Sequence, residues 1–433
     1  MRASAVDSTL PLLLEGYGWL PNQRRRTGRD AVPLRLAGQP AVALCGPDAA
    51  RFFYDERHVR RAGAVPGPVQ RTLFGRGAVH TLDGPVHRRR KSIFVGLGTP
   101  EAVRGLTDEV TAAWDRAVGA WAGRHVVLFD EASRVLAGAV CRWAGVAPGS
   151  GAAPTAAAAD PVAAAAGSPV AAYQDAVASL AADLVAMVDG FATPSLAHWR
   201  ARRARRRREA WLGALVTRLR DGAATAPPGS VLDTVARHVD AEGRPLSARA
   251  AAVELLNVLR PTTAVCWFVS FAAHALHRWP AHRARLAAGD PAFARAFTHE
   301  VRRFYPFAPF VGGRAVRDLR WQGTPIPADA LVLLDVYGQN HDARLWAEPY
   351  TFAPERFLGR EIDPFTLIPQ GGGDPAAGHR CPGESATVGL LAALSQRLAA
   401  LSYRLPPQDL AIPLHRIPTR PRSGVVLTDV SAP

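Results

Sequence analysis

A cysteine near the end of the chain stands in a setting that favours chemistry. Cys381 follows the segment 371–378, which contains four glycines, a proline and two alanines. Such a composition disfavours helix and strand and predicts a loop. Residues 384–401 place Leu and Ala on one face of an amphipathic helix, so Cys381 would precede a helix N-terminus. With His379 and Arg380 beside it, we expect a lowered thiol pKa and a thiolate.

A thiolate in this setting could be a nucleophile, a structural metal ligand or an axial haem ligand. Zinc requires three or four Cys or His ligands in short pairs, whereas Cys45, Cys141 and Cys266 stand far apart and no Cys-x-x-Cys occurs. A cysteine nucleophile requires a histidine base, which any of 13 histidines could supply. The loop alone therefore disfavours zinc and leaves the other two roles open.

Two upstream motifs complete an ordered set. Glu300 and Arg303 stand at i and i+3 of a helical pattern, and Pro354-Glu-Arg-Phe357 follows about fifty residues later. Glu-x-x-Arg, Pro-Glu-Arg-Phe and a Gly-rich loop ending in Cys-x-Gly, in this order, resemble the cytochrome P450 superfamily. The resemblance implies a mainly α fold with small β-sheets, in which haem lies between a long kinked helix and the cysteine loop. It also implies that Cys381 is the axial iron ligand and that Glu300, Arg303 and Arg356 form a buried structural ion network.

The loop sequence resembles that of one branch, the bacterial fatty-acid peroxygenases, in the segments Ile-Pro-Gln-Gly-Gly-Gly-Asp and Gly-His-Arg-Cys-Pro-Gly-Glu. It departs from the usual pattern at Ala377, where a glycine is usual. A long helix predicted over 246–279, with Ser247 as its cap, carries Arg260 and Pro261 at its middle. Pro261 should kink this helix, and an arginine in so apolar a stretch requires an anion. Oxygen-activating members of the superfamily carry an acid and a threonine at this kink, and the arginine and proline pair is the signature of the peroxygenase branch.

The resemblance also implies roles for other side chains. His87 and Lys91, at i and i+4 of a helix predicted over 86–94, match the pattern that binds haem propionates, and His379 is placed to join them. His80, in the Gly-punctuated stretch 73–84, stands where relatives carry Gln or His near the distal haem face, and it could otherwise be a polar loop residue. We expect its imidazole to donate a proton near neutral pH. The acyl-chain pocket is expected to contain Phe74, Val188, Phe191, Phe307 and Phe310, of which Phe307 and Phe310 also suit an ordinary core.

Composition and patterning bound the architecture. The 433 residues show no linker with globular sequence on both sides, so we expect a single domain over 1–433 with an Ala-rich surface insertion at about 149–172. Short apolar runs in the first 60 residues predict a small N-terminal sheet, and residues 401–430 predict terminal strands. No uncharged apolar run of about 18 residues and no leader pattern occur, so we expect a cytoplasmic protein without a membrane span.

The net charge of +15 comes almost entirely from arginine. The densest run, 200–208, superficially suggests nucleic acid, but it lacks a recognisable reading motif and better suits a solvated or partner-facing surface.

The leading functional hypothesis is a haem b peroxygenase that uses hydrogen peroxide to hydroxylate fatty acids at the α or β carbon, with decarboxylation to terminal alkenes as a second outcome. No obligatory redox partner is expected, nor nucleic acid. The alternatives are a reductase-dependent P450 monooxygenase and, from another class, a haem-binding sensor or a basic nucleic-acid scaffold. Oligomeric state and preferred chain length stay open.

Overall fold

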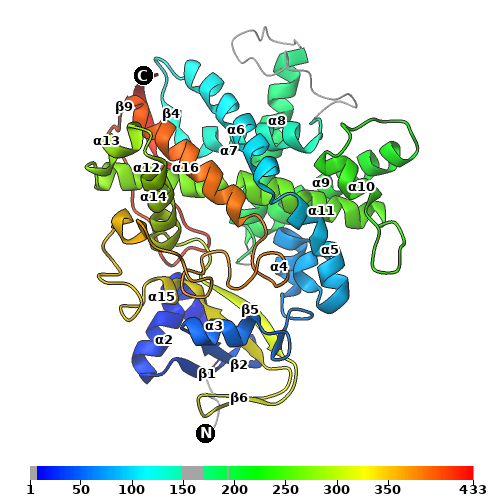
Figure 1. Ribbon diagram of the computed structural model, residues 1–433, viewed down its shortest axis with the longest axis vertical. Coiled ribbons are helices and arrows are strands. Elements are labelled where there is room, and N and C mark those ends of the chain that lie inside the picture. The colour runs from blue at the N-terminus through cyan, green and yellow to red at the C-terminus, as the bar shows by residue number, and fades with distance from the viewer. Residues whose placement is uncertain (1–6, 149–168, 193–194, 433) are drawn as a thin grey trace.

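The chain is built mainly of helices, with one group of strands at the end where the N-terminus lies and a smaller group at the opposite end, beside the C-terminus (Figure 1). A computed structural model describes residues 7–148, 169–192 and 195–432. The helices are α1 Thr9–Glu15, α2 Trp19–Thr27, α3 Pro47–Tyr54, α4 Gly67–Val69, α5 Gly84–Gly96, α6 Pro100–Gly119, α7 Leu128–Ala144, α8 Pro169–Asp189, α9 Leu196–Arg220, α10 Val231–Arg237, α11 Ala248–Thr263, α12 Val265–Arg278, α13 His282–Ala287, α14 Pro291–Phe304, α15 Val336–Asn340 and α16 Glu384–Ala400. Tighter or wider turns are η1 Gly16–Gly18, η2 Gln70–Phe74, η3 Val79–Thr81 and η6 Pro354–Phe357. The predicted fold class is confirmed.

The strands of the described residues form a five-stranded sheet, a three-stranded sheet and a hairpin. They are β1 Ala31–Leu36, β2 Gln39–Leu44, β3 Val59–Arg60, β4 Val126–Val127, β5 Phe310–Ala315, β6 Leu319–Trp321, β7 Thr324–Ile326, β8 Leu331–Asp335, β9 Ser402–Arg404 and β10 Val426–Ser431. The five-stranded sheet has the order β1-β2-β8-β5-β3. The predicted N-terminal strands are therefore present, but strands from the second half of the chain complete their sheet.

Both faces of this sheet are covered because side chains alternate along each strand. Val42 and Leu44 of β2 pack in one cluster with Phe53 of α3. Ala41 and Ala43 of the same strand face a second cluster that contains Trp19 of α2.

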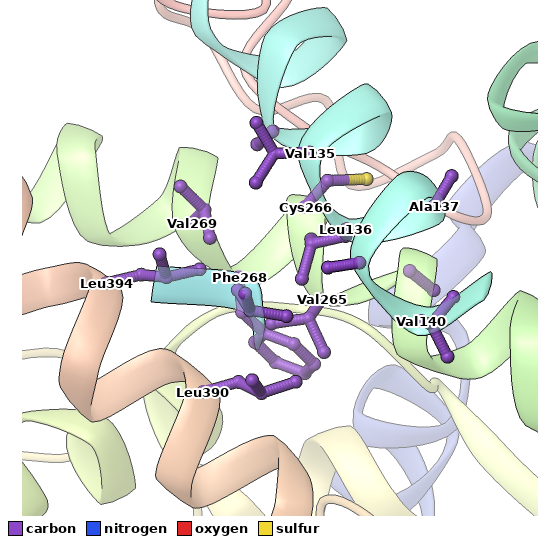
Figure 2. Packing of buried hydrophobic residues seen from close by; sticks show 14 of the residues in the cluster. Val135, Leu136, Ala137, Val140, Val265, Cys266, Phe268, Val269, Leu390 and Leu394 are labelled. Atoms are coloured by element: carbon purple, nitrogen blue, oxygen red, sulfur yellow. The ribbon is translucent and has the colours of Figure 1, made fainter. Parts of the chain in front are cut away.

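The helical core fixes the helix that follows the cysteine loop. Figure 2 shows α7, α12 and α16 meeting through buried apolar side chains, among them Val135, Leu136, Val140, Val265, Phe268, Val269, Leu390 and Leu394. Leu390 and Leu394 are 1% exposed, so one face of α16 is sealed against this core. The residues before α16, including Cys381, are thereby held at a fixed place relative to α12.

The long helix predicted over 246–279 is present but divided. The Ser247 hydroxyl accepts the Ala250 amide at 3.1 Å and caps α11, as expected. Pro261 lies in the last turn of α11 and cannot donate to the carbonyl four residues earlier. The helix is interrupted at Ala264 and resumes as α12, so the discontinuity falls three residues beyond the proline.

The terminal strands predicted over 401–430 are present as β9 and β10. The segment 405–425 between them forms no strand, because it carries Pro406, Pro407, Pro413, Pro418 and Pro421, which cannot donate to a ladder.

One sequence expectation is wrong. The Arg-rich run is not entirely a solvated surface, since Arg205 is 1% exposed. It donates to the carbonyls of Leu73 at 2.7 Å and Phe74 at 2.8 Å, and its charge pairs with Glu209 at 2.6 Å. A run that covers every face of a helix necessarily places some members inward.

Two helical stretches, Pro169–Asp189 and Ala248–Arg278, have the length and apolarity of a membrane span. The most apolar window of the second is 89% buried within the protein, as in a core helix, and that of the first is 33% buried. The Ala-rich insertion predicted at 149–172 lies outside the described residues except for its last four, which begin α8.

The ion network predicted around Glu300 is confirmed. Both carboxylate oxygens of this fully buried side chain bind Arg303, at 2.7 Å and 2.8 Å. Arg356 Nε lies 3.2 Å from one oxygen, and the Ala353 amide donates to the other at 2.9 Å. The network joins α14 to η6 and braces the segment that leads to the cysteine loop.

Removing Arg303 should therefore destabilise the protein strongly. We expect Arg303→Ala to lower the free energy of unfolding by about 3–5 kcal/mol, because Glu300 would stay buried with only part of its charge compensated. Urea unfolding checks this. Arg104→Ala, which removes the exposed pair with Glu101, serves as the control and should leave the midpoint unchanged. Equal midpoints for both variants would contradict the structural role of the network.

Candidate active site

The loop that presents Cys381 is shaped by close packing and by hydrogen bonds. Gly371 has φ +97°, and a Cβ there would meet the Tyr54 hydroxyl at 2.6 Å, so only glycine fits. The Cys381 amide donates to the Gln370 carbonyl at 3.1 Å. Arg380 donates to the Gly373 carbonyl at 2.9 Å, which closes the loop. The thiol thus has a fixed position before α16.

The expected lowering of the Cys381 pKa is wrong for the protein alone. Burial raises the pKa of the thiol, while the Gly383 amide lowers it and Glu384 raises it. The positive charge of Arg380, next to the cysteine, is compensated within the protein, because Arg380 pairs with Glu384 at 2.6 Å. A coordinated metal ion deprotonates a thiol outright, so a half-buried thiol with a raised pKa still fits a metal ligand.

Gln370 holds a polar group against the sulfur. Its side-chain oxygen accepts Arg302 Nε at 3.0 Å, which orients the amide nitrogen toward Cys381 Sγ at 3.8 Å and Thr387 Oγ1 at 3.1 Å. Arg302 in turn pairs with Glu384. Sequence reasoning missed this arrangement, because nothing in the loop pattern shows which helix reaches it.

Lys91 ties α5 to the cysteine loop. The side chain is 2% exposed, and its ammonium donates to the carbonyls of Gly378 and of Arg380, the latter at 2.9 Å. Burial lowers the pKa of Lys91 to about 8, although the nearby thiol opposes this. The helix and the loop are therefore joined on the side where a cofactor carboxylate is expected.

His87 and His379, predicted to act together, do meet. Their rings stack with centroids 3.9 Å apart. His379 Nε2 lies 3.4 Å from Asp83 Oδ1 and 3.8 Å from Glu56 Oε1. Burial lowers the pKa of His87 to about 3 and also lowers that of His379, so both rings are neutral at pH 7. His87 Nδ1 is buried without a hydrogen-bond partner among the described residues.

Arg260 is a buried cation that has no carboxylate partner among the described residues. The residue is 7% exposed, and no carboxylate within 7–148, 169–192 and 195–432 forms an ion pair with it. Its one side-chain hydrogen bond among these residues runs to Asn257 Oδ1 at 3.4 Å, and its Nε has no partner. Burial and the charge of Arg205 lower the pKa of Arg260 to about 9, which still leaves it charged at pH 7. An uncompensated guanidinium calls for an anion from outside the chain.

His80 and Phe74 lie beside this arginine. The Phe74 ring centroid is 5.8 Å from the guanidinium carbon of Arg260 and 4.4 Å from the His80 ring. Burial and the charge of Arg260 lower the pKa of His80 to about 3. The expectation that His80 donates a proton as imidazolium near pH 7 is therefore wrong for the ligand-free protein, and its neutral ring offers one hydrogen-bond donor instead.

The structure brings the two sides of the site toward one space. A thiolate at Cys381 would raise the pKa of Arg260, and His87 and His379 would lower that of His80 if they were protonated, so these groups lie within electrostatic range of one another. Pro261 is exposed although the ten residues before it in α11, 251–260, are all buried. The helix therefore faces an opening at the position where a planar cofactor is expected.

The predicted acyl-pocket residues occupy different surroundings. Val188 is 4% exposed and belongs to the helical core. The Phe307 ring packs against Phe268 of α12 in a tilted arrangement, with the ring centroids 4.9 Å apart. Phe191 is half-buried just after α8. The ring centroids of Phe310 and Trp19 are 5.8 Å apart, and Phe310 packs against the apolar cluster that contains Trp19 on one face of the five-stranded sheet. This agrees with the interpretation of Phe310 as a core residue.

Known proteins resemble this chain over all of its length or over its last third. A family model described as Cytochrome P450 matches residues 292–426. Carnosic acid synthase of Rosmarinus officinalis is 38% identical over 96 residues, 21% of this chain and 18% of that protein. Cytochrome P450 76C3 of Arabidopsis thaliana is 34% identical over 115 residues, 26% of this chain and 21% of that protein. These matches span about a fifth of the curated relatives.

Solved structures match over nearly the whole chain. Cytochrome P450SP alpha (CYP152B1), in complex with (R)-ibuprofen, has a TM-score of 0.90 and 40% identity, covering 99% of this chain and 100% of that one. Cytochrome P450EX alpha (CYP152N1), with myristic acid, has a TM-score of 0.90 and 33% identity, covering 99% and 98%. A variant of cytochrome P450 OleT, in complex with arachidonic acid, has a TM-score of 0.91 and 34% identity, covering 99% and 98%. The chain belongs to the cytochrome P450 family.

A cytochrome P450 holds haem through a cysteine thiolate, and the residues of this P450 fit that group. Cys381 is presented from a closed loop, and among the described residues His87 Nδ1, His80 Nδ1 and Arg260 Nε are buried polar atoms without a hydrogen-bond partner. Such atoms are costly unless a bound group satisfies them.

We predict that Cys381 supplies the thiolate. The reduced, carbon-monoxide-bound protein should show the red-shifted Soret band of a haem thiolate, and Cys381→Ser should abolish it because an alcohol does not provide that ligand. Cys45→Ala, which alters a buried cysteine of the sheet, should keep the band. A red-shifted band that survives in Cys381→Ser would exclude this assignment.

Proposed function

We propose that this P450 is a peroxygenase that uses hydrogen peroxide to oxidise fatty acids at the α or β carbon, with decarboxylation to a terminal alkene as a second product. The observation that carries the proposal is the buried, acid-free guanidinium of Arg260 on the helix that faces the cysteine loop. The ligands of the three solved relatives, ibuprofen, myristic acid and arachidonic acid, are all carboxylic acids. A carboxylate is thus the anion that Arg260 is built to receive.

The cofactor in this proposal is haem b, which Cys381 would hold through its thiolate and whose carboxylates His87, Lys91 and His379 would bind. When bound, it supplies the iron chemistry through which peroxide oxidises a C–H bond. The chain itself supplies the geometry. Because Arg260 fixes the carboxylate at one end of the space, the carbons next to the carboxyl group lie nearest the reacting centre. Phe74, Val188, Phe191 and Phe307 are proposed to contact the acyl chain.

Proton transfer is assigned to the substrate. Arg260 and Pro261 stand where other members of the superfamily carry an acid and a threonine. The nearest acid upstream in α11, Glu254, has both oxygens occupied by Arg90, the Val79 amide and Asn257. A carboxylate held at Arg260 is therefore placed to move a proton on the distal side. Peroxide carries both oxygen atoms and both electrons, so no redox partner is required.

Arg260→Ala should abolish most fatty-acid binding. Removing one member of a buried charge pair costs about 3–5 kcal/mol, which corresponds to a loss of affinity of more than about a hundredfold. Substrate-induced changes in the haem spectrum measure the affinity, and mass spectrometry measures the products.

A fatty-acid methyl ester should bind equally to the parent and to Arg260→Ala and be oxidised poorly by either. Adding a short carboxylic acid should restore turnover of uncharged substrates in the parent alone. Full peroxide-driven oxidation of the free acid by Arg260→Ala would exclude carboxylate assistance.

The affinity for fatty acids should also depend on pH through Arg260. Burial and the charge of Arg205 lower the pKa of Arg260 to about 9. Anion binding requires the protonated form, so affinity should be level near neutral pH and fall about tenfold for each pH unit above about 9. The methyl ester should show no such fall. Equal pH profiles for acid and ester would contradict the pairing.

His80 is proposed to influence the choice between hydroxylation and decarboxylation. A carboxylate bound at Arg260 removes one cause of the low pKa of His80, because it neutralises the cation next to the ring. Glutamine forms hydrogen bonds but carries no titratable proton. His80→Gln should therefore shift products toward hydroxy acids while haem content stays unchanged. The same alkene to hydroxy-acid ratio in parent and variant would leave His80 as a polar loop residue.

A further inference from the structure

Glu254 of α11 is a buried carboxylate with an unusually complete set of contacts. Its side chain is 0% exposed. One oxygen accepts the Val79 amide at 3.0 Å and Arg90 Nη1 at 2.9 Å, and the other accepts Asn257 Nδ2 at 3.0 Å. These donors come from η3, from α5 and from α11 itself, so one side chain joins three elements around the site.

The first consequence concerns Arg260. Glu254, Asn257 and Arg260 stand three residues apart in succession, which makes each the neighbour of the next along the helix surface. Because Asn257 gives its amide nitrogen to Glu254, its amide oxygen must point the other way. That oxygen faces Arg260 Nη2 at 3.4 Å. The orientation of the guanidinium is thus limited by a chain of contacts that starts at Glu254.

The second consequence concerns His80. Glu254 holds the backbone of Val79, the residue directly before His80 in the short turn η3. The His80 ring packs on Phe74, which also contacts Arg260. One carboxylate therefore supports both polar residues that are proposed to meet the substrate carboxyl group.

The third consequence is electrostatic. A free carboxylate on α11 would attract Arg260 and compete with a substrate anion. Arg90, 12% exposed, neutralises Glu254 at 2.9 Å through the carboxylate oxygen that Asn257 does not contact. Glu254 can therefore orient Arg260 through Asn257 while leaving the positive charge of Arg260 for the substrate.

We propose that Glu254 is a positioning residue that sets, through Asn257, the orientation of Arg260 and, through the Val79 amide, that of His80, and thereby determines which carbon next to the carboxyl group is oxidised. The inference rests on the proposed fatty-acid oxidation at this site. Glu254 itself does not touch the substrate. Its effect is expected in the preference for free acid over ester and in the product ratio.

The experiment compares Glu254→Gln and Asn257→Leu with the parent holoenzyme. Glutamine keeps the shape but has one acceptor oxygen in place of two. With that oxygen on the Val79 amide, Asn257 can pair with the variant only by turning its amide over, which directs its nitrogen instead of its oxygen at Arg260. Dissociation constants for one fatty acid and its methyl ester come from haem spectral titration. We expect the preference for the free acid to fall about tenfold in each variant, as for the loss of a hydrogen bond to a charged group. The ratio of α to β oxidation products should change in both.

A matched control separates positioning from stability. Asp183→Asn removes another buried carboxylate that pairs with arginine, since Asp183 binds Arg208 at 2.6 Å, between α8 and α9. It should keep the parental preference and product ratio. A folded, haem-loaded Glu254→Gln that keeps both values would overturn the proposal.

Two further outcomes are decisive. If Glu254→Gln does not load haem, Asn257→Leu decides alone: a retained preference overturns the proposal and a lost one supports it. If the parent shows no preference for the free acid, the proposed function fails first, and the inference fails with it. A parental preference that survives in both variants removes only the role of Glu254.

Discussion

This site depends on a buried guanidinium that forms no ion pair with a carboxylate of the described residues. Arg260 is costly to keep in an apolar helix, and its cost is offset only when an anion arrives. The surroundings preserve that demand: Arg90 neutralises the acid upstream in the same helix, Glu254, and Arg205 is paired with Glu209. Under the proposed function, substrate binding and charge compensation are the same event. This links the choice of substrate to the assembly of the proton-transfer group.

The opposite side of the site relies on rigidity. The loop that carries Cys381 is closed by backbone hydrogen bonds, anchored by Lys91 from α5 and followed by a helix sealed in the apolar core. The ion network around Glu300 braces the segment before it. A thiol that is held this firmly keeps its position whether or not it is protonated. Its raised pKa in the protein alone follows from burial, and a metal ion is what would convert it to thiolate.

The sequence predicted the parts of the site that local pattern controls. The glycine-rich composition before Cys381, the helix after it and the arginine and proline inside an apolar helix can each be recognised from neighbouring residues. What depends on distant elements could not be predicted. The pairing of Arg380 with Glu384 removed the charge expected to activate the thiol, and the burial of Arg205 depended on which face of α9 meets the turn at Phe74. Glu254 had a visible signal, a charge in an apolar helix, but its partners lie far away in the chain.

The claim that Arg260 receives the substrate carboxylate is tested most directly by isotope-edited infrared spectroscopy. A fatty acid labelled with carbon-13 at the carboxyl group is bound to the holoenzyme, and its carboxylate and carbonyl bands are followed as the pH is lowered. Pairing with a buried arginine lowers the pKa of a carboxyl group by about 1–3 units. The bound acid should therefore remain a carboxylate at about pH 4, where ordinary carboxyl groups take up their proton. A label that is protonated when bound at neutral pH, or that titrates as in free solution, would contradict the account.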